Sequence, residues 1–408
     1  MRVAYLNPSG QLGGAEACLL DLLASLREAE PGWPLRLIVA SEGPIVSKAR
    51  TLGVMTTVVP FPPSLARLGD AGLGGAGARH IDRIVLLQNL LSAVPAVAAY
   101  VRRLRCAIKD LAPDVVHTNG FKMHILGVWS RPQRTPMIWH VHDYVRPRPI
   151  MARMLRKYAR HCSAVVTNSK SVADDVQSIC GGELKVYPVH NAIDLDRFAP
   201  TGSTLDLDAL AGLPPAEAGT VKVGLVGTIG FWKGHTVFLR ALSLLPPSLP
   251  VRGYVVGGAL YQTDRSQHDV GALRRFATQL GISHKVGFTG FAEEPAAAMR
   301  ALDIVVHAST RPEPFGLVIV EAMACGRAVI VSQAGGAAEI IAEGINALGH
   351  APGDATGLAD RITQLATNAK LRAELGKAGR ATAERHFDRA RLATELIPIY
   401  REVTLSEN

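Results

Sequence analysis

Short apolar runs alternate with helix-length amphipathic stretches along nearly the whole chain, and this alternation starts twice. Brief Val- and Ile-rich runs bounded by Pro, Asp or Gly are typical of buried strands. The first series contains RVAYLN, LRLIVA, VMTTVVP, DVVHTN, MIWHVH and SAVVTNS, and the second contains VKVGLVGTIG, YVVGG, HKVGFTG, DIVVHAS, AVIVS and NALGH. Helix-length segments such as 15–29 and 150–161 separate them. Strands that alternate with helices predict parallel sheets built from βα units.

A polar connector that contains Pro and Asp, at residues 194–219, separates the two series. With 408 residues, the chain is long enough for two hydrophobic cores. We therefore predict an α/β protein with two Rossmann-like domains, at residues 1–200 and 201–385, whose parallel sheets face each other across a cleft. Residues 386–408 are expected to form a helix that packs back towards the N-terminal domain. Ligands of such sheets bind beyond the carboxyl ends of the strands.

Composition narrows the class of protein and its partners. Hydrophobic residues make up 48% of the chain and charged residues 19%, as in a globular protein. The formal charge of +9 permits anionic partners, but we find no basic stripe interleaved with aromatic residues, and we expect no nucleic acid. The five cysteines form no CxxC pair, and the N-terminus shows no signal region. We therefore expect a protein of the reducing cytoplasm.

One apolar stretch, at residues 84–100, bears on contact with a membrane. It is shorter than the about 20 apolar residues of a spanning helix and contains Pro95, so we expect a buried or interfacial helix. Arginines follow it directly, and a second cluster at 146–161 interleaves cations with apolar residues. This pattern is compatible with peripheral contact with the inner face of an anionic membrane. The alternative is that the apolar residues pack in the core and the cations form a solvated face.

Two glycine-containing turns join a strand to a helix and suit the binding of an anion. Gly13 and Gly14, in NPSGQLGGAE, stand at the start of the first helix, where free amides favour an anion; a plain tight turn is the alternative. Lys233, in GLVGTIGFWKG, lies near another helix start and suits a phosphate, although solvated lysines are common there. The second turn is not a P-loop, because GxxxxGK[ST] does not occur.

The segment HASTRPEPFGLVIVEAMACGRAVIVS carries the strongest signal. A strand leads into a Pro-restricted turn and then into a helix expected to begin near Gly316. Glu313 precedes this helix and Glu321 lies within it, roughly 12 Å apart along the axis if the whole segment is helical. That is too far for a glycosidase-like pair acting on one bond. The amides of Phe315, Gly316 and Leu317 are expected to be free and to bind phosphate between the carboxylates. The alternative is a helix-start charge and a solvated glutamate.

These motifs together resemble glycosyltransferase family 4, the retaining nucleotide-sugar transferases of GT-B fold. Glu313 and Glu321 match the E-x7-E signature of the family, and the resemblance runs from GGAE through VVHTN, HVHD, TNS and VHNAIDLDRF to the final helix. It implies that the N-terminal domain binds the acceptor and the C-terminal domain binds the donor. The first acceptor-side region resembles the family poorly, and its Pro- and Gly-rich loop at 61–77 is a candidate acceptor element.

The resemblance implies a role for each matched residue. The donor-binding residues are Gly13, Gly14, Thr228, Lys233, Phe315, Gly316, Leu317 and Glu321. The two glycine amides and Lys233 would contact the diphosphate, and Glu321 would bind the ribose hydroxyls. Glu313 and His142 would be the catalytic residues: Glu313 would lie beside the donor sugar, and His142 would lie across the cleft against the sugar and the reacting centre.

Two details leave alternatives open. His140 and His142 alternate on one strand face, as a metal pair would, but no third ligand at metal spacing is evident, and we favour the sugar-facing role for His142. Thr228 occupies the position where the family usually has Arg, and losing that guanidinium weakens diphosphate binding unless Arg311 or Arg265 substitutes. The two spelled matches to DxD, Asp194–Asp196 and Asp206–Asp208, fall in the connector and are interpreted as turn or capping residues.

The implied reaction moves a sugar from a nucleotide-diphosphate sugar, with UDP expected first and GDP next, to a hydroxyl of a sugar, lipid-linked or small-molecule acceptor. No protein nucleophile is evident, so the enzyme would position the partners and stabilise the leaving diphosphate, without a metal or cofactor. Three alternatives remain. An epimerase on the same scaffold would convert the donor without acceptor, a dinucleotide oxidoreductase should show GxGxxG, and a non-catalytic relative would bind the donor without turnover.

Overall fold

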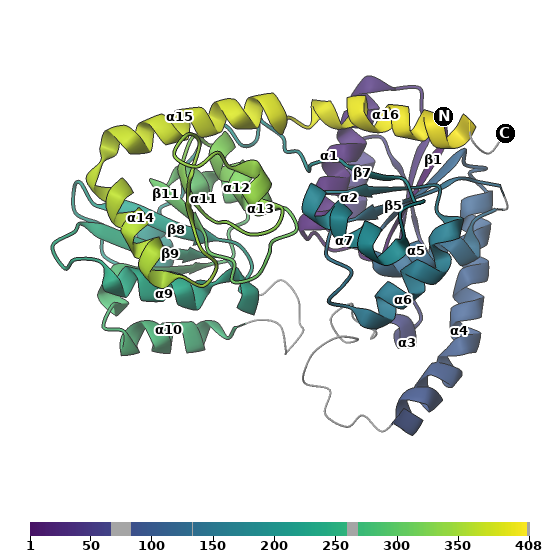
Figure 1. The fold of residues 1–408 in the computed structure, drawn as a ribbon, viewed down its shortest axis with the longest axis horizontal. Coiled ribbons are helices and arrows are strands. Elements are labelled where there is room, and N and C mark those ends of the chain that lie inside the picture. The colour runs from purple at the N-terminus through teal and green to yellow at the C-terminus, as the bar shows by residue number, and fades with distance from the viewer. Residues whose placement is uncertain (67–82, 133, 259–267, 406–408) are drawn as a thin grey trace. The chain divides into compact units, whose positions relative to one another are not determined.

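In a computed structural model, the described residues are 1–66, 83–132, 134–258 and 268–405. They divide into two compact units (Figure 1). Unit 1 contains residues Met1–Asn191 and Arg389–Asn408, and unit 2 contains Ala192–Asp388. Each unit has one sheet in which all paired strands are parallel. The predicted α/β class with two parallel sheets is therefore confirmed.

The sheet of unit 1 has the strand order β3-β2-β1-β4-β5-β6-β7. Its strands are β1 (Val3–Asn7), β2 (Leu35–Val39), β3 (Met55–Val58), β4 (Val115–Asn119), β5 (Met137–Val141), β6 (Ala164–Thr167) and β7 (Val186–Pro188). The helices are α1 (Gly14–Ala29), α2 (Pro44–Thr51), α3 (Pro63–Ala66), α4 (Arg83–Lys109), α5 (Phe121–Ser130), α6 (Pro149–Tyr158), α7 (Lys170–Cys180) and α16 (Ala390–Leu405), with a 3-10 turn at Ala159–His161. Strands β1, β4 and β5 are buried at every position, as near-continuous apolar runs of a covered parallel sheet should be.

The C-terminal helix α16 belongs to unit 1 and packs on α1. Tyr400 is fully buried there, and its hydroxyl lies 3.1 Å from the hydroxyl of Tyr5 and 2.7 Å from Nδ1 of His117. The backbone amide of Ala393 donates to the hydroxyl of Ser25 on α1. The end of the chain therefore contributes core side chains to the first sheet.

The sheet of unit 2 has the strand order β10-β9-β8-β11-β12-β13. Its strands are β8 (Val221–Val226), β9 (Val251–Val256), β10 (Val286–Gly290), β11 (Ile304–His307), β12 (Ala328–Ser332) and β13 (Leu348–His350). The α-helices are α8 (Leu207–Ala211), α9 (His235–Leu244), α10 (Val270–Gln279), α11 (Pro295–Arg300), α12 (Leu317–Ala324), α13 (Ala337–Ile340), α14 (Ala355–Thr367) and α15 (Ala369–His386). The 3-10 turns are η2 (Phe231–Lys233) and η3 (Ser283–Lys285). Buried apolar residues lie on both faces of this sheet.

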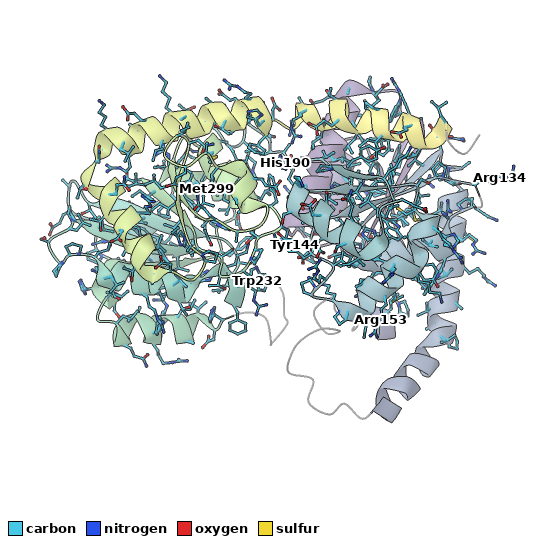
Figure 2. The ribbon with its side chains drawn as sticks, viewed as in Figure 1. Arg134, Tyr144, Arg153, His190, Trp232 and Met299 are labelled. Atoms are coloured by element: carbon cyan, nitrogen blue, oxygen red, sulfur yellow. The ribbon has the colours of Figure 1, made fainter. Side chains whose placement is uncertain are left out.

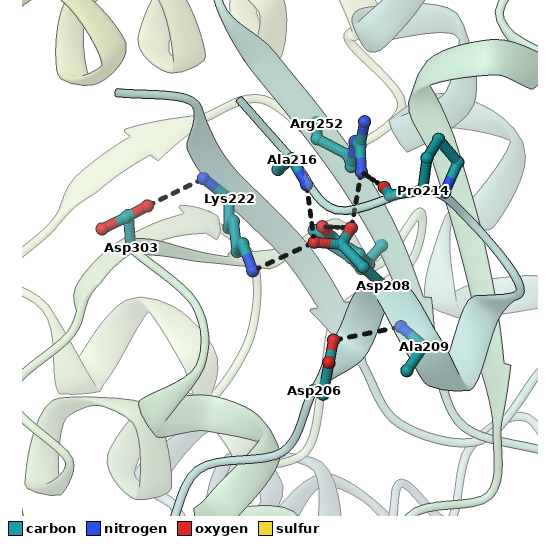
Figure 3. A network of polar contacts seen from close by, with 9 residues as sticks. Asp206, Asp208, Ala209, Pro214, Ala216, Lys222, Arg252 and Asp303 are labelled. Carbon is teal, nitrogen blue, oxygen red and sulfur yellow. Dashed lines mark hydrogen bonds and ion pairs between the residues drawn. The ribbon is translucent and has the colours of Figure 1, made fainter. Parts of the chain in front are cut away.

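An ion cluster around Asp208 fixes the connector to the sheet of unit 2 (Figure 3). The buried Asp208 carboxylate accepts hydrogen bonds from Arg252 and Tyr254, each at 2.6 Å, and lies 3.4 Å from the Lys222 amine. Asp206 caps α8 instead, because its side chain accepts from the amide of Ala209. Asp194 likewise accepts from amides of the following turn. The capping interpretation is thus confirmed for Asp194 and Asp206, and it is wrong for Asp208, whose carboxylate pairs with strand cations.

The structure also bears on the predicted loop at 61–77 and on the apolar stretch at 84–100. The expected loop at 61–77 contains the short helix α3 at Pro63–Ala66, where the loop prediction is wrong, and the rest of it from residue 67 lies outside the described residues. The apolar stretch at 84–100 belongs to α4, which is longer than expected and contains Pro95. Among the described residues, no helix combines the length and apolarity that crossing a membrane requires.

Candidate functional site

An ion pair joins two loops at the carboxyl end of the sheet of unit 2. Nζ of Lys233 lies 2.7 Å from Oε1 of Glu313. Lys233 follows β8 and Glu313 follows β11, the neighbouring strands at which the strand order reverses. Such a reversal is the topological switch point at which open α/β sheets bind their ligands. The structure thus brings together two residues that the sequence analysis assigned to the donor.

A glycine explains how these two loops approach each other. Gly234 follows Lys233 with φ +75, and a Cβ built there would lie 1.8 Å from the carbonyl oxygen of Ala308. Any side chain would therefore push the loops apart. Trp232, labelled in Figure 2, adds a second link, because its carbonyl accepts from the amide of Thr310 at 2.7 Å.

The Glu313 carboxylate is buried and multiply bonded. The Ser309 hydroxyl donates to it at 2.5 Å, and Nε2 of His307 lies 3.4 Å from it. Burial alone would raise the pKa of Glu313, but the charge of Lys233 and the bonds from His307 and Lys233 outweigh burial and hold the pKa well below its ordinary value. Glu313 is therefore an ionised carboxylate. Ser309 and His307 were missed in the sequence, although both stand at the end of a predicted strand.

The helix after Glu313 begins where the sequence predicted it. Gly316 is the N-cap of α12 at φ +102, and the helix runs from Leu317. The amides of Gly316 and Leu317 have no hydrogen-bond partner among the described residues, so they are open to an anion. Phe315 is buried and its ring packs against Phe387, so it can reach a ligand only through its backbone. Glu313 lies outside the helix, so the axial distance between the two carboxylates that was calculated for a wholly helical segment does not apply.

Glu321 lies in the second turn of α12 and is half-buried. Its carboxylate accepts no hydrogen bond from another described residue. Burial raises the pKa of Glu321 to about 7, although the charge of Arg197 opposes the shift. A half-buried carboxylate without a donor is costly, and ligand hydroxyls would satisfy it.

The cation expected near Thr228 is not identified. Thr228 is half-buried in the turn after β8. Arg311 is exposed and makes no hydrogen bond or ion pair with the described part of the chain. Arg265 lies outside the described residues.

In unit 1, the glycine turn precedes α1 as predicted, but its two amides differ. The amide of Gly13 donates to Oε2 of Glu16 at 3.1 Å, so binding a phosphate there would require this bond to break. The amide of Gly14 has no partner within the described ranges. Glu16 was missed in the sequence, although a glutamate three residues after an N-cap is the capping-box signature.

His142 follows β5 at the carboxyl edge of the first sheet, beside the end of β4. Nε2 of His142 lies 2.5 Å from Oδ1 of Asn119, whose amide nitrogen donates to Oδ1 of Asn7 at 2.6 Å. Burial lowers the pKa of His142 to about 4. Asn7 and Asn119 were missed, although each ends a predicted strand with a polar residue.

The metal alternative gains no support from the ring geometry. The rings of His140 and His142 lie 4.0 Å apart between centroids. Among the described residues, no group of three or more His, Cys, Asp or Glu side chains could hold a metal ion. His140 is buried, and neither of its ring nitrogens has a described hydrogen-bond partner.

The second basic cluster lies on and beside α6. Arg153, labelled in Figure 2, is exposed, as are Arg156 and Lys157. The interleaved Met151 and Leu155 are buried in the core of unit 1. Apart from Ile150, which is 40% exposed, the apolar residues of this helix therefore face the protein or its margin.

The sheets and their loops define a two-unit α/β protein with polar sites at the switch points. Comparison with known proteins identifies its family. The sequence model described as "Glycosyltransferase Family 4" matches residues 12–197, and "Glycosyl transferases group 1" matches residues 215–382. The chain belongs to glycosyltransferase family 4, and its fold is GT-B.

Several relatives are similar over much of the chain. D-inositol 3-phosphate glycosyltransferase from Xylanimonas cellulosilytica is 28% identical over 71% of this chain and 72% of its own length. The same enzyme from Mycolicibacterium smegmatis is 31% identical over 66% of this chain, which covers 62% of that protein. The lipopolysaccharide core biosynthesis glycosyltransferase LpsE from Rhizobium meliloti is 28% identical over 57% of this chain and 62% of its own length.

Solved structures agree with this assignment. Anabaena Alr3699/HepE in complex with UDP-glucose is 26% identical, with a TM-score of 0.78, and the match covers 98% of this chain and 100% of that one. Sucrose-phosphate synthase from Thermosynechococcus elongatus, at 20% identity and a TM-score of 0.75 over 99% of each chain, shares the fold.

Proposed function

We propose that the protein transfers a sugar from a UDP-sugar to an acceptor hydroxyl with retention of the anomeric configuration. The observation that carries the proposal is the Lys233–Glu313 ion pair at the switch point, followed on α12 by the amides of Gly316 and Leu317 and the Glu321 carboxylate, which have no hydrogen-bond partner among the described residues. A cation, helix-start amides and a carboxylate in this order suit a diphosphate, a sugar and a ribose. HepE, which binds UDP and UDP-glucose, supports UDP as the nucleotide.

In this proposal the donor diphosphate draws the Lys233 amine from Glu313. The Glu313 carboxylate then accepts a hydrogen bond from a hydroxyl of the sugar, and the amides of Gly316 and Leu317 bind the anion. Glu321 accepts from the ribose hydroxyls. Gly14, His142 and, once released from Glu16, Gly13 are the proposed contacts of unit 1 with the same donor.

The proposed reaction requires no protein nucleophile. The bond between C1 of the sugar and the diphosphate oxygen breaks, and its electron pair leaves with UDP. The acceptor oxygen bonds to C1 from the same face, and its proton passes to the departing phosphate oxygen. Lys233 and the helix-start amides stabilise the charge on the leaving group. We propose that these groups suffice without a metal, so EDTA should leave turnover intact; loss of turnover restored by Mn²⁺ or Mg²⁺ would overturn this.

The acceptor is proposed from the relatives. The name of one group of relatives contains inositol 3-phosphate, which presents hydroxyl and phosphate groups, and another relative is named for lipopolysaccharide core biosynthesis. The formal charge of +9 suits an anionic acceptor. We therefore propose a polyhydroxylated acceptor that carries phosphate.

A calorimetric titration tests the donor site. UDP should bind to the wild-type chain, and Glu321→Gln should weaken UDP binding because an amide is a poorer acceptor for the ribose hydroxyls. Glu374→Gln is the matched control, since Glu374 is exposed on α15 and far from the α12 start in sequence. Equal UDP affinity in the wild type and Glu321→Gln would refute the assignment of Glu321, and preference for GDP would refute the nucleotide.

Release of UDP distinguishes the remaining alternatives. A transferase releases UDP from UDP-glucose when an acceptor such as inositol 3-phosphate is added, whereas an epimerase converts the donor alone. Binding without release across sugar-phosphate and lipopolysaccharide-core acceptors would favour a non-catalytic relative, the alternative that Thr228 raises.

A further inference from the structure

A backbone carbonyl sets the direction of the hydrogen bonds along the carboxyl edge of unit 1. Nδ2 of Asn7 donates to the carbonyl oxygen of Ser9 at 2.6 Å. Because a carbonyl can only accept, the amide of Asn7 must present its oxygen to Asn119. Nδ2 of Asn119 donates to that oxygen at 2.6 Å, so Oδ1 of Asn119 faces His142.

This direction decides which ring nitrogen of His142 carries the proton. Oδ1 of Asn119 can only accept, and it lies 2.5 Å from Nε2 of His142, so Nε2 must donate. A neutral imidazole has one N–H group, and Nδ1 is then a bare acceptor. Burial lowers the pKa of His142 to about 4, so the ring is neutral at neutral pH.

Nδ1 of His142 is buried and has no hydrogen-bond partner among the described residues. An unpaired buried acceptor is destabilising, and a hydroxyl that donates to it removes that cost. The ring is held on several sides. Asn168 donates to the backbone carbonyl of His142 at 3.0 Å, and the ring of His140 lies 4.0 Å away between centroids.

The ends of two neighbouring strands place Asn7 and Asn119 beside each other. Asn7 ends β1 and Asn119 ends β4, so their hydrogen bond spans the switch point of unit 1. Both side chains are buried, at 0% and 1% exposure. Glu16 on α1 also lies 3.5 Å from Nδ2 of Asn7, which links the chain of bonds to the glycine turn.

We propose that Asn119, oriented by Asn7 and the Ser9 carbonyl, is a positioning residue that keeps the His142 proton on Nε2 and leaves Nδ1 to accept a hydrogen bond from a substrate hydroxyl. The identity of that hydroxyl, on the donor sugar or on the acceptor, rests on the proposed glycosyl transfer. The arrangement selects a hydroxyl over a carbonyl, because a carbonyl has no proton to donate.

Long-range ¹H–¹⁵N correlation spectra of the ¹⁵N-histidine-labelled full chain test the proton position without turnover. His142→Gln identifies the His142 signals among the 13 histidines. The wild type should show a protonated Nε2 and a bare Nδ1 at neutral pH. A protonated Nδ1, or an imidazolium at neutral pH, would overturn the proposal.

Two variants of Asn119 then test the positioning role. In Asn119→Asp a carboxylate faces Nε2, so the pKa of His142 should rise by about 1 unit or more, and the acidic limb of the kcat profile should move to higher pH. In Asn119→Ala the tautomer is no longer fixed, and kcat should fall about 10- to 100-fold with little change in donor KM. Unchanged pH profiles and unchanged kcat in both variants would refute the positioning role.

Asn346→Asp is the matched control, because Asn346 is a buried amide of unit 2 whose hydrogen bonds to described residues all lie within its own unit. It should leave the tautomer of His142 and the pH profile unchanged. If no UDP-sugar is turned over at all, the proposed function fails, and the spectra of the wild type still decide the proton position. If turnover is found with a protonated Nδ1, the inference fails alone.

Discussion

Nζ of Lys233 lies 2.7 Å from Oε1 of Glu313, and this pair joins the loops that follow β8 and β11. In unit 1, the hydrogen bond between Asn119 and Asn7 joins the ends of β4 and β1 in the corresponding way. Both contacts span a switch point, where two neighbouring strands send their chains to opposite sides. The contact in unit 2 joins a cation to a carboxylate. The contact in unit 1 joins two neutral amides beside a neutral histidine, with the Glu16 carboxylate 3.5 Å from Nδ2 of Asn7. In the proposed function, unit 2 therefore supplies the cation for the diphosphate.

Replacing Lys233 should impair both binding and stability. Lys233→Ala leaves the buried Glu313 carboxylate without its cation, which should cost about 3 kcal/mol of unfolding free energy for unit 2. It should also lower kcat/KM at least about tenfold, since the diphosphate loses a charge-assisted contact. Chemical denaturation and initial rates measure the two effects. Lys370→Ala, which removes an exposed cation of α15, is the control, and equal losses in both variants would contradict the proposed role.

Substitutions of the two glutamates of the E-x7-E motif should affect different kinetic constants. Glu321→Ala should raise the donor KM, because the ribose loses its acceptor. Glu313→Ala should chiefly lower kcat, because Glu313 lies beside the sugar in the proposal. Initial rates over a donor series measure both constants. Wild-type kinetics in both variants would refute the site assignment.

Donor affinity should depend on pH through Glu321. The pKa of about 7 means that the carboxylate becomes protonated as the pH falls through 7. A protonated carboxyl is a poorer acceptor for two ribose hydroxyls, so the Kd for UDP should rise below pH 7 and level off above it. Calorimetry between pH 6 and 8 measures the dependence, which Glu321→Gln should flatten. A retained slope in Glu321→Gln would assign the titration to another group.

Unit 1 and unit 2 should both lose stability in acid because of buried neutral histidines. Burial lowers the pKa of His117 and His235 to about 3 and that of His142 to about 4. Below the ordinary value of about 6.5 the unfolded chain binds protons that the folded chain does not, so stability falls as the pH falls. Each group contributes up to about 1.4 kcal/mol per pH unit between 6.5 and its folded pKa.

Replacing His140 offers a check on this acid sensitivity. Burial also holds the pKa of His140 well below its ordinary value, and both its ring nitrogens are unpaired among the described residues. His140→Leu removes the protonatable ring and the unpaired nitrogens, so denaturation at pH 5 should show a smaller loss of stability than in the wild type. A steeper acid loss in His140→Leu would contradict the interpretation.

The periodicity of the sequence predicts the fold well because buried parallel strands need uninterrupted apolar runs. The same runs place Lys233 and Glu313 after strands of one series, so their chemistry could be expected. Their ion pair could not, since it depends on which loops meet, and Gly234 allows that meeting only in the folded sheet. Asp208 was misread for a related reason: its cations lie on β8 and β9, which follow it by many residues.

Any contact of α6 with a membrane should be electrostatic. On α6 the cations are exposed while Met151 and Leu155 are buried, so little apolar surface is available to enter a bilayer there. We therefore propose contact of unit 1 with anionic vesicles through charge alone, each cation near the surface contributing about 1 kcal/mol. Co-sedimentation should show binding at low salt, loss of binding at high salt, and none to neutral vesicles. A variant with Arg153, Arg156 and Lys157 changed to Glu should not bind, whereas Lys370→Glu on α15 should bind like the wild type. No binding by the wild type at low salt would refute the contact and favour an acceptor free in solution.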